Sequence, residues 1–475
     1  IAGDSSDYFE LPYGPVFFAL GGEYRKEKSE ATFDNWQLGV LPEGSQYQSG
    51  TLISEYSTNN SLVFQPSIKV ANETGDFDVS EIFVEVSLPL IEGEMLVEEL
   101  TLDLAARYSD YSTIGDTTTW RANLMYSPFD DLMIRLSQSQ AIRAPNINEL
   151  FGPEVGATFR PTDPCNASVI EGIRGNDANA ADIIQANCVA DLQSIGFDPI
   201  DENGNYIYTD PLSAAFPGVT GGNAELQEET ADTTTLGFVY QASWLEGFSL
   251  TADYWSIEIE SAISSVTSDD IVNGCYSGET LNENFCSLFT RNTDSSSPQF
   301  GGFNFLRTTA VNFARLETSG VDFSVGYDFA VGAHNFMTKV SGTKVNEIDQ
   351  YTNPNDLNDV NPELGEVNKP ELAGNINLTW QWEDIQIGWQ TQYMDEQLVG
   401  YVEIEDYERG DYDDSVVMDE FWQHDINFSY NINEELMVYG GIKNVTNEEP
   451  FLTNFAYPAS ARGRFYFVGI DMRLE

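Results

Sequence analysis

Apolar and polar side chains alternate one by one along segment after segment of this 475-residue chain. The pattern is clear in NINLTWQWE (375–383), IQIGWQTQY (385–393) and HDINFSYNI (424–432). Successive side chains of a β-strand point to opposite faces, so a period of two predicts strands. Each predicted strand has one apolar face and one hydrated face.

The connections between these segments alternate as well, between short and long. The short ones are residues 11–15, 91–94, 128–131, 245–247, 331–334, 383–384 and 433–435. The long ones are residues 30–77, 143–229, 262–302, 350–371, 400–420 and 446–463, with 113–116 as a short exception. Short turns at one end of a sheet and long loops at the other are typical of an outer-membrane barrel. A soluble β-sandwich would not sort its loops by length in this way.

The predicted fold class is therefore all-β, a transmembrane antiparallel β-barrel with long extracellular loops. Full strands are predicted at residues 15–29, 78–90, 97–112, 117–127, 132–142, 230–241, 248–261, 303–329, 334–349, 372–383, 385–399, 421–433, 436–445 and 464–475, and residues 1–11 would end one more. Closing such a sheet pairs all backbone groups within lipid. Outward aromatic residues fit interfacial girdles, for example Trp380, Trp382, Trp389, Tyr393 and Tyr430. A polar inner wall implies water or a polar plug inside.

The chain is strongly acidic, with 21 Lys and Arg against 77 Asp and Glu and a formal net charge of −56. Phosphate binding needs a basic surface, so this charge argues against nucleic acid as a partner and against a role built on anionic lipid. The acidity indicates either a solvated surface suited to salty surroundings or loops that gather cations or cationic ligands. With 2 histidines, a His-based metal site or catalytic apparatus is hard to assemble. We expect no enzymatic activity.

Four cysteines occur, Cys165, Cys188, Cys275 and Cys286, in no zinc-ribbon or haem-attachment spacing. Three pairings can be drawn, and four free thiols are the alternative. We predict the local pairing, Cys165 with Cys188 and Cys275 with Cys286, which closes two separate loops. Disulfides would place these loops in an oxidising compartment.

The strand predicted at 132–142 runs away from the short turns and reaches the outer surface at Arg143, Ala144 and Pro145. Proline has no N–H to donate to the ladder, so strand pairing stops there. The chain then makes its longest excursion and returns through GGNAELQEETADTTTLGF (221–238).

The segment IRAPNINELFGP (142–153) resembles the RAPN-x-x-ELF segment of TonB-dependent receptors of the outer membrane. The residues that carry this motif and its return strand are Arg143, Ala144, Pro145, Asn146, Glu149, Leu150, Phe151, Gly222, Asn223, Leu226, Glu229 and Gly237. DYFELPYGPVFFALGGEYRKE (7–27) resembles a mid-barrel hairpin of the family. KNVTNEEP (443–450) followed by GRFYFVGIDMRL (463–474) resembles its ending. The four matches stand in the family's order and span almost the whole chain.

The resemblance implies a 22-stranded barrel with an N-terminal plug inside it. It also implies active import of a scarce ligand, with outer-membrane lipid and the TonB–ExbB–ExbD system as partners. No plug or TonB box is recognised in the sequence, and several family strands are unaccounted for. Residues 1–475 are therefore expected to be the C-terminal portion of one receptor barrel, without a separate second domain. Leu474 stands where the family usually ends on an aromatic residue, and Glu475 follows.

The expected ligand is neutral, such as an oligosaccharide, or else cationic or metal-bearing, because an anionic ferric siderophore would require Arg and Lys. A ferric-siderophore receptor and a passive porin-like channel are the alternatives. The loop aromatics expected to stack on a sugar include Tyr206, Tyr208, Tyr276, Phe289 and Tyr401. The acidic runs 353–366 and 403–414 could hold calcium, and no other cofactor or metal is expected. A surface lipoprotein is a further expected partner.

Overall fold

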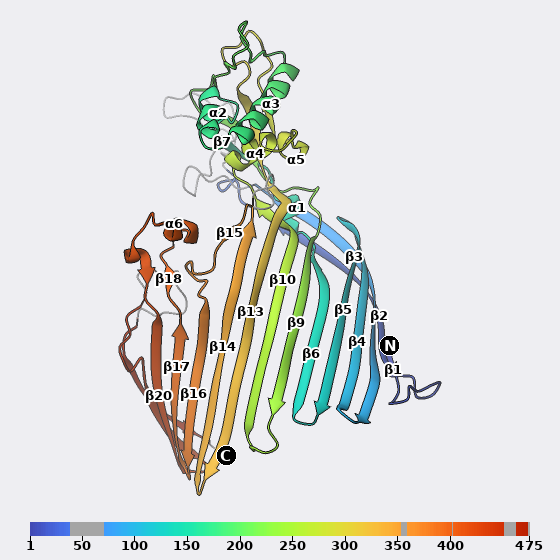
Figure 1. The fold of residues 1–475 in the computed structure, drawn as a ribbon, viewed down its shortest axis with the longest axis vertical. Helices are drawn as coiled ribbons and strands as arrows, with labels where there is room; N and C mark the ends of the chain where they lie inside the picture. Colours follow the sequence, from blue (N-terminus) through green and yellow to red (C-terminus); the bar gives the residue numbers. More distant parts are fainter. Residues whose placement is uncertain (39–70, 353–358, 401, 451–461, 474–475) are drawn as a thin grey trace.

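A computed structural model describes residues 1–38, 71–352, 359–400, 402–450 and 462–473. One long antiparallel sheet forms its body (Figure 1). In order across the sheet, the strands are β1 Ala2–Asp4, β2 Phe17–Ala31, β3 Glu73–Glu94, β4 Val97–Tyr111, β5 Gly115–Phe129, β6 Leu132–Arg143, β9 Glu229–Gln241, β10 Phe248–Ser265, β13 Ala310–Val331, β14 His334–Tyr351, β16 Leu372–Trp382, β17 Ile385–Met394, β20 Phe421–Asn433, β21 Leu436–Lys443 and β22 Phe465–Met472. The short strand β15, Asn361–Pro362, pairs with β14.

The register of the sheet brings the apolar side chains to one face. Leu136 of β6 pairs with Leu236 of β9, which pairs with Tyr254 of β10, which pairs with Val321 of β13. The first three of these side chains are 43%, 51% and 42% exposed. A continuous row of exposed apolar side chains would be unstable in water, so this face is the one that meets acyl chains.

Aromatic side chains on that face cluster at two heights. Trp380 stacks with His334 and with Trp382 near the short turns. Tyr393 of β17 and Trp422 of β20 contact each other toward the opposite ends of the neighbouring strands. Ile385, the partner of Trp382, lies eight residues before Tyr393 on one strand, a span of about 27 Å at about 3.4 Å per residue. This agrees with the roughly 25 Å apolar band of outer-membrane barrels, so the two clusters mark the membrane interfaces.

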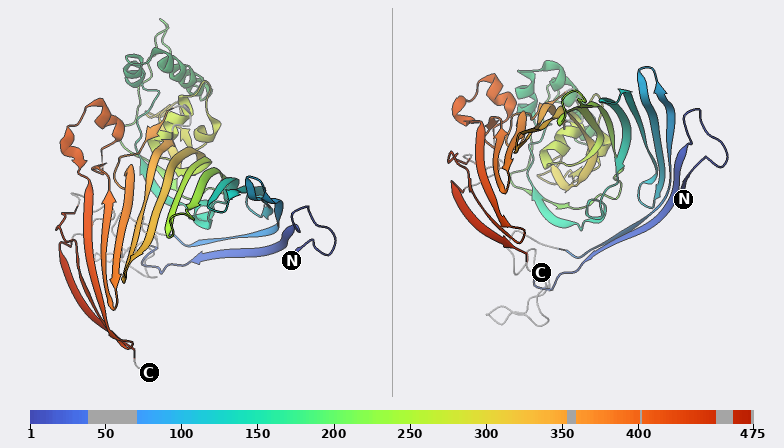
Figure 2. Two further views of the ribbon diagram at one scale, coloured as in Figure 1. Left: turned by 60° about the horizontal axis from the view of Figure 1, so that its bottom comes forward. Right: turned by 90° about the horizontal axis from the view of Figure 1, so that it is seen from below.

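The opposite face of the sheet is polar, as the alternation predicts. Asn375 pairs with Gln392 and Asn377 with Gln390 across β16 and β17. Arg135 of β6 bonds Asp253 of β10 through both carboxylate oxygens, at 2.8 and 2.7 Å. Figure 2 shows that the sheet curves around a central space. Because the apolar face meets lipid, the polar face lines this space. Within the described residues, the strand path runs from β1 to β22 without a recorded pair between them.

The predicted strands and fold class are confirmed, with two corrections. The segment 303–329 is two strands: β12, Phe303–Thr308, belongs to a separate small sheet, and β13 begins at Ala310. The segment 385–399 ends as a wall strand at Met394, and Gln397–Leu398 (β18) pairs with Val417–Met418 (β19) instead. In both places the strand partner changes within one predicted segment, and periodicity does not identify partners.

The excursions predicted as loops at 143–229 and 262–302 fold together into a compact unit, here called the cap (residues 144–228 and 266–309). Its elements are α1 Ile147–Phe151, β7 Val155–Phe159, α2 Ala167–Arg174, α3 Ala178–Ser194, β8 Phe216–Thr220, α4 Ser268–Tyr276, α5 Glu283–Cys286, β11 Phe289–Arg291 and β12. The small sheet has the order β11-β12-β8-β7. Seen from the short-turn end, the cap lies over the space that the wall encloses (Figure 2). A smaller outer unit holds β18, α6 Ile404–Arg409, the 3-10 helix η1 Asp414–Val416 and β19.

Local sequence explains where the cap helices begin. Asn146, Asn166, Asp177, Thr267 and Asn282 each accept a hydrogen bond from a backbone N–H in the first turn of the helix that follows. These side chains satisfy donors that the helix itself leaves unpaired. In the described part of the chain, none of the helices has the length and hydropathy needed to cross a bilayer.

Charge placed on the outward face tests the lipid assignment. Leu378 pairs with Thr338 and Trp389 between the two aromatic clusters and is 43% exposed. We expect Leu378→Glu to destabilise the folded barrel by about 2 kcal/mol, because a carboxylate would enter hydrocarbon. Thr379→Glu, one residue further and facing the bore, should cost little. Folding in liposomes along a urea titration measures both, and equal costs for the two variants would contradict the assignment.

Candidate functional site

The base of the cap is held by one arginine between two glutamates. Arg143, the last residue of β6, bonds both carboxylate oxygens of Glu229 at 2.5 and 2.7 Å and reaches Glu149 at 3.1 Å. Glu149 also accepts the N–H of Asn146 at 2.7 Å. Glu229 accepts the N–H of Ile263 at 2.7 Å. This clamp joins the ends of β6, β9 and β10 to the first helix of the cap.

The other residues of the RAPN motif and its return strand lie around the clamp. Pro145, Leu150 and Leu226 are almost fully buried. The side-chain amide of Asn223 donates to the carbonyl of Ala310 at 3.0 Å. At Gly222 an added Cβ would lie 2.5 Å from the backbone nitrogen of Gly152, so only glycine allows this approach. The residues of the motif therefore have a structural role, because they hold the base of the cap against the ends of the strands.

The clamp predicts a pH dependence. Burial alone would raise the pKa of Glu229, but hydrogen bonds from Arg143 and from the Ile263 N–H outweigh it and lower that pKa. A carboxylate whose pKa is depressed by folding stabilises the fold above its ordinary pKa of about 4.3, and the stabilisation is lost as pH falls through the depressed value. Hydrogen exchange at Ile263 should therefore stay slow from neutral pH down to about pH 4 and accelerate below it. Glu229→Gln should exchange faster throughout without that step, and a step retained in this variant would contradict the assignment.

Two disulfides staple the cap, and the predicted local pairing is confirmed. Cys165 bonds Cys188, 23 residues apart, and Cys275 bonds Cys286, 11 residues apart. The first bridge ties Cys165, two residues before α2, to α3, and the second ties α4 to α5. Cys165, Cys188 and Cys275 all lie in the apolar core of the cap.

A buried arginine occupies the centre of that core. The side chain of Arg291 is 2% exposed and that of its partner Asp163 is 0% exposed. The two form a bidentate pair at 2.8 and 3.0 Å, and Arg291 also bonds Asp191 at 3.0 Å. The rings of Tyr208 and Tyr276 flank the guanidinium, and a third ring, that of Phe303, lies 4.3 Å from it. Pairing, hydrogen bonds and ring contacts together offset the cost of burying the charge.

Three of the predicted sugar-stacking aromatics belong to this core. Tyr208, Tyr276 and Phe289 are 1%, 0% and 8% exposed. Burial raises the pKa of the Tyr208 hydroxyl, which bonds Asp163 at 2.9 Å. Tyr208 and Tyr276 therefore offer no open face to a ligand, whereas Phe289, although mostly buried, lines the first cavity described below. Tyr206 is partly buried with its hydroxyl bonded to the Cys165 carbonyl at 2.7 Å, and Tyr401 lies outside the described residues.

The cap carries 18 Asp and Glu, 4 Arg and no Lys. All four arginines are in ion pairs with carboxylates: Arg160 with Asp210, Arg174 with Glu171 and Asp182, Arg291 with Asp163 and Asp191, and Arg307 with Glu154. No cationic side chain of the cap is left to neutralise an anionic ligand.

A cavity of about 740 Å³ lies between the cap and the beginning of β13. Its walls come from α5 and the residues after it, from β11 and β12, from residues 223–227 and from residues 309–313. The volume falls in the range typical of small-molecule sites. Phe305 on β12 lines this cavity and is 37% exposed.

A second cavity, of about 720 Å³, lies on the other side of the link between β12 and β13. Val155, Phe159 and Val266 are among its lining residues. Thr309 lines both cavities and is 5% exposed, and its hydroxyl has no hydrogen-bond partner in the described structure. Such groups are rare in folded proteins.

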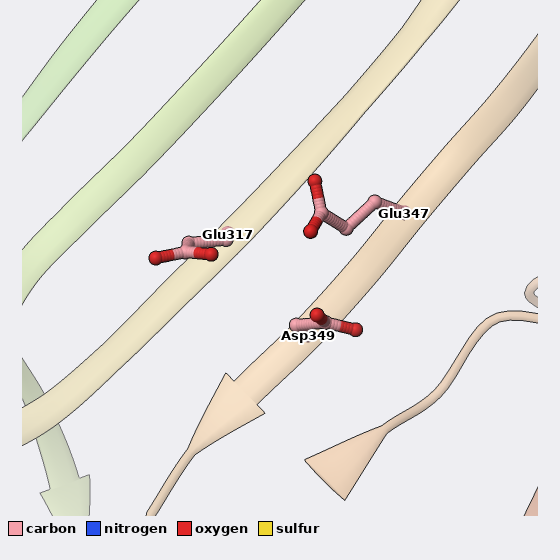
Figure 3. Close-up of side chains that lie close together, drawn as sticks. All are labelled: Glu317, Glu347 and Asp349. Carbon is pink, nitrogen blue, oxygen red and sulfur yellow. The ribbon is translucent and has the colours of Figure 1, made fainter. Parts of the chain in front are cut away.

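Three carboxylates converge on the wall just below the cap. Glu317 of β13 and Glu347 and Asp349 of β14 each offer an oxygen, and these lie within 4.8 Å of one another (Figure 3). Burial and the neighbouring Glu347 and Glu317 raise the pKa of Asp349. Oxygen ligands of this kind suit calcium. However, Glu317 already bonds Arg315 at 3.1 Å and Tyr351 at 3.2 Å, which accounts for part of the charge.

The acidic runs predicted to hold calcium are partly committed to local ion pairs. Lys369 bonds Glu363 at 2.6 Å and Glu366 at 3.2 Å. Asp406 and Asp411 both pair with Arg409. Residues 353–358 lie outside the described residues.

Sequence reasoning missed Phe305, Arg291 and the carboxylate group. The predicted membrane strand 303–329 includes Phe305, and the break in alternation at Thr308 and Thr309 is the signal that separates it from that strand. Arg291 has no signal in its own segment, because its partner Asp163 is 128 residues away.

Comparison with known proteins identifies the fold. The family described as TonB dependent receptor-like, beta-barrel matches residues 4–445. The ferric enterobactin receptor PfeA of Pseudomonas aeruginosa, as a variant bound to enterobactin, matches with TM-score 0.56 at 13% identity, covering 98% of this chain and 52% of that one. The siderophore receptor PirA of Acinetobacter baumannii matches with TM-score 0.56 at 12% identity, covering 98% and 53%. The FrpB iron transporter of Neisseria meningitidis matches with TM-score 0.50 at 13% identity, covering 96% and 52%. A search of curated proteins found no match.

The chain thus spans about half the length of the solved receptors that it matches. At such identity the likeness to them shows the fold alone. The family match covers most of the chain, and it agrees with the apolar outward face, the polar inward face and the short turns at one end. The chain belongs to the TonB-dependent receptor-like β-barrels of the outer membrane, a family of transporters and not of enzymes.

Proposed function

We propose that this receptor takes up a scarce neutral nutrient, such as an oligosaccharide, across the outer membrane. The cap captures the ligand, and the TonB–ExbB–ExbD system supplies the energy. The family membership supports the transport role. The ligand class rests on one observation: every arginine of the cap is ion-paired, and the cap has no lysine.

Charge pairing decides between ligand classes because an anionic chelate needs cationic partners. A ligand carboxylate or catecholate would enter a cap that carries 18 acidic side chains and 4 arginines. To gain a cation it would have to displace an Asp or Glu that already holds one, leaving that carboxylate unpaired. A neutral ligand requires no such exchange, since its hydroxyl groups can donate hydrogen bonds to carboxylates and to amides alike.

Growth and uptake measurements test the proposal. A strain lacking the receptor should grow normally on monosaccharides and on iron salts and poorly on one neutral oligosaccharide. Plasmid-borne receptor should restore uptake of that sugar, and a protonophore should abolish it, which separates energised import from passive diffusion. A growth defect confined to an anionic ferric siderophore would overturn the ligand class. Uptake that persists with the protonophore would overturn the energised mechanism.

A further inference from the structure

We propose that the cavity between β11, β12 and the start of β13, here called the β12 cavity, binds one ring of a neutral sugar. Phe305 supplies the stacking surface, and Asn284, Thr290 and Thr309 bond the sugar hydroxyls. This inference rests on the proposed function, because it names the site at which a neutral oligosaccharide is held.

Phe305 is placed as a stacking surface. It lies on β12 opposite Thr290 of β11 and is 37% exposed at the cavity wall. The neighbouring rings of Phe303 and Phe289 pack against each other in the core, 5.1 Å apart, while Phe305 makes no contact with another ring in the described structure. An aromatic face open toward a polar cavity suits the flat apolar face of a pyranose.

The polar groups of the cavity divide into two sets. Asn223, Gln227 and Asn312 are committed to the frame: Asn312 donates to the carbonyls of Gln227 and Ser261 at 3.0 and 2.9 Å, and accepts the Gln227 N–H at 2.9 Å. The second set consists of Glu225, Asn284, Thr290 and Thr309, which line the same cavity. Their side chains make no hydrogen bond to any other described residue. A fixed frame with uncommitted donors and acceptors is the arrangement of a preformed binding site.

Thr309 gives the strongest indication of a missing partner. Its hydroxyl is enclosed, with the residue 5% exposed, and has neither donor nor acceptor within reach among the described residues. A buried hydroxyl without a hydrogen bond is costly, and a bound hydroxyl would remove the cost. The oxygen lies where the cap meets the wall, so a ligand bonded to it would touch both parts.

Charge limits the occupant of the cavity. Among the residues that the structure describes, Arg307 is the one cationic side chain that lines it, and Arg307 is already paired with Glu154. Glu225 lines the cavity, and its carboxylate would repel an anion while accepting hydrogen bonds from hydroxyl groups. The combination of one open ring, amides, hydroxyls and a carboxylate fits a neutral polyhydroxy ligand and disfavours a ferric catecholate.

The experiment is calorimetric titration of the purified full-length receptor. The probes are maltohexaose, cellohexaose, xylohexaose and chitohexaose, with ferric enterobactin as the anionic probe. The variants are Phe305→Ala, Phe305→Trp and Asn284→Ala. Tyr412→Ala is the matched control, because Tyr412 is 40% exposed in the smaller outer unit and does not line the β12 cavity. Protease resistance of the cap confirms that each variant folds.

One of the four hexasaccharides should bind the wild-type receptor. Phe305→Ala should weaken that binding about tenfold, since one aromatic contact is lost. Phe305→Trp should retain affinity, Asn284→Ala should weaken it, and Tyr412→Ala should leave it unchanged. If a hexasaccharide binds Phe305→Ala and Asn284→Ala with unchanged affinity, the β12 cavity is not the sugar site. The proposed function would still stand in that case. Binding of ferric enterobactin alone, or of none of the hexasaccharides, would overturn both.

Discussion

Replacing Arg291 by methionine should destabilise the cap by about 3–5 kcal/mol, the cost of leaving a buried carboxylate without its partner. Asp163 has no exposed side-chain surface, and its two oxygens take bonds from Arg291 at 2.8 and 3.0 Å. Methionine fills similar space beside the rings of Tyr208, Tyr276 and Phe303, so lost volume contributes little. The effect therefore isolates the uncompensated charge.

Pulse proteolysis across a urea series measures this cost, because the cap can unfold while the wall remains paired. Arg174→Met is the matched control: this arginine bonds Glu171 and Asp182 at the cap surface and is 30% exposed. Its removal should cost less than about 1 kcal/mol. Adding Asp163→Asn to Arg291→Met should recover part of the loss, since an amide is cheaper to bury than a carboxylate. Equal costs for Arg291→Met and Arg174→Met would show that the buried pair is not the centre of the cap.

Loss of Arg291 should also abolish ligand capture at the β12 cavity. Arg291 ends β11, and β11 pairs with β12, which carries Phe305. Unfolding of this pair removes one wall of the cavity. The stability of the cap core and the affinity of the cavity are therefore expected to fall together in this variant, whereas Phe305→Ala lowers affinity alone.

The wall could be predicted from sequence because its determinants are local. The alternation that places Leu378 outward and Thr379 inward is visible in consecutive residues of the sequence. A register shift of one residue would move every side chain of the strand to the opposite face. The disulfide pairing was predictable for a related reason: short separations of 23 and 11 residues favour closure within one loop.

The cap was not predictable in this way because its determinants are distant. Asp163, Asp191 and Arg291 meet from three parts of the chain, and each alone resembles a solvated loop residue. Aromatic composition of a loop was a poor guide for the same reason. Tyr276, in a predicted loop, is fully buried. Phe305, in a predicted strand, is 37% exposed. Exposure depends on tertiary contacts that neither periodicity nor composition encodes.

Removing the disulfide between Cys165 and Cys188 by a double serine substitution should destabilise the cap by roughly 3 kcal/mol, according to the chain-entropy account of a 23-residue loop. Cys275–Cys286 closes a shorter loop, of 11 residues, in the unfolded chain. Its removal should therefore cost about 0.6 kcal/mol less on the same account. Urea-dependent proteolysis of the two double variants, with the reduced wild-type receptor as the reference for loss of both, measures the difference.

The two disulfides should rank in the opposite order for ligand binding. Cys286 ends α5, the helix that carries Asn284, and Ser287 and Leu288 directly after it line the β12 cavity. Loss of Cys275–Cys286 should free this wall and weaken hexasaccharide binding, because a mobile wall must be ordered again each time the ligand binds. Cys165 and Cys188 lie in the core and do not line that cavity, so their removal should leave affinity nearly unchanged wherever the cap stays folded. If the variant that loses more stability also loses more affinity, the ligand contacts are distributed over the whole cap and not confined to the β12 cavity.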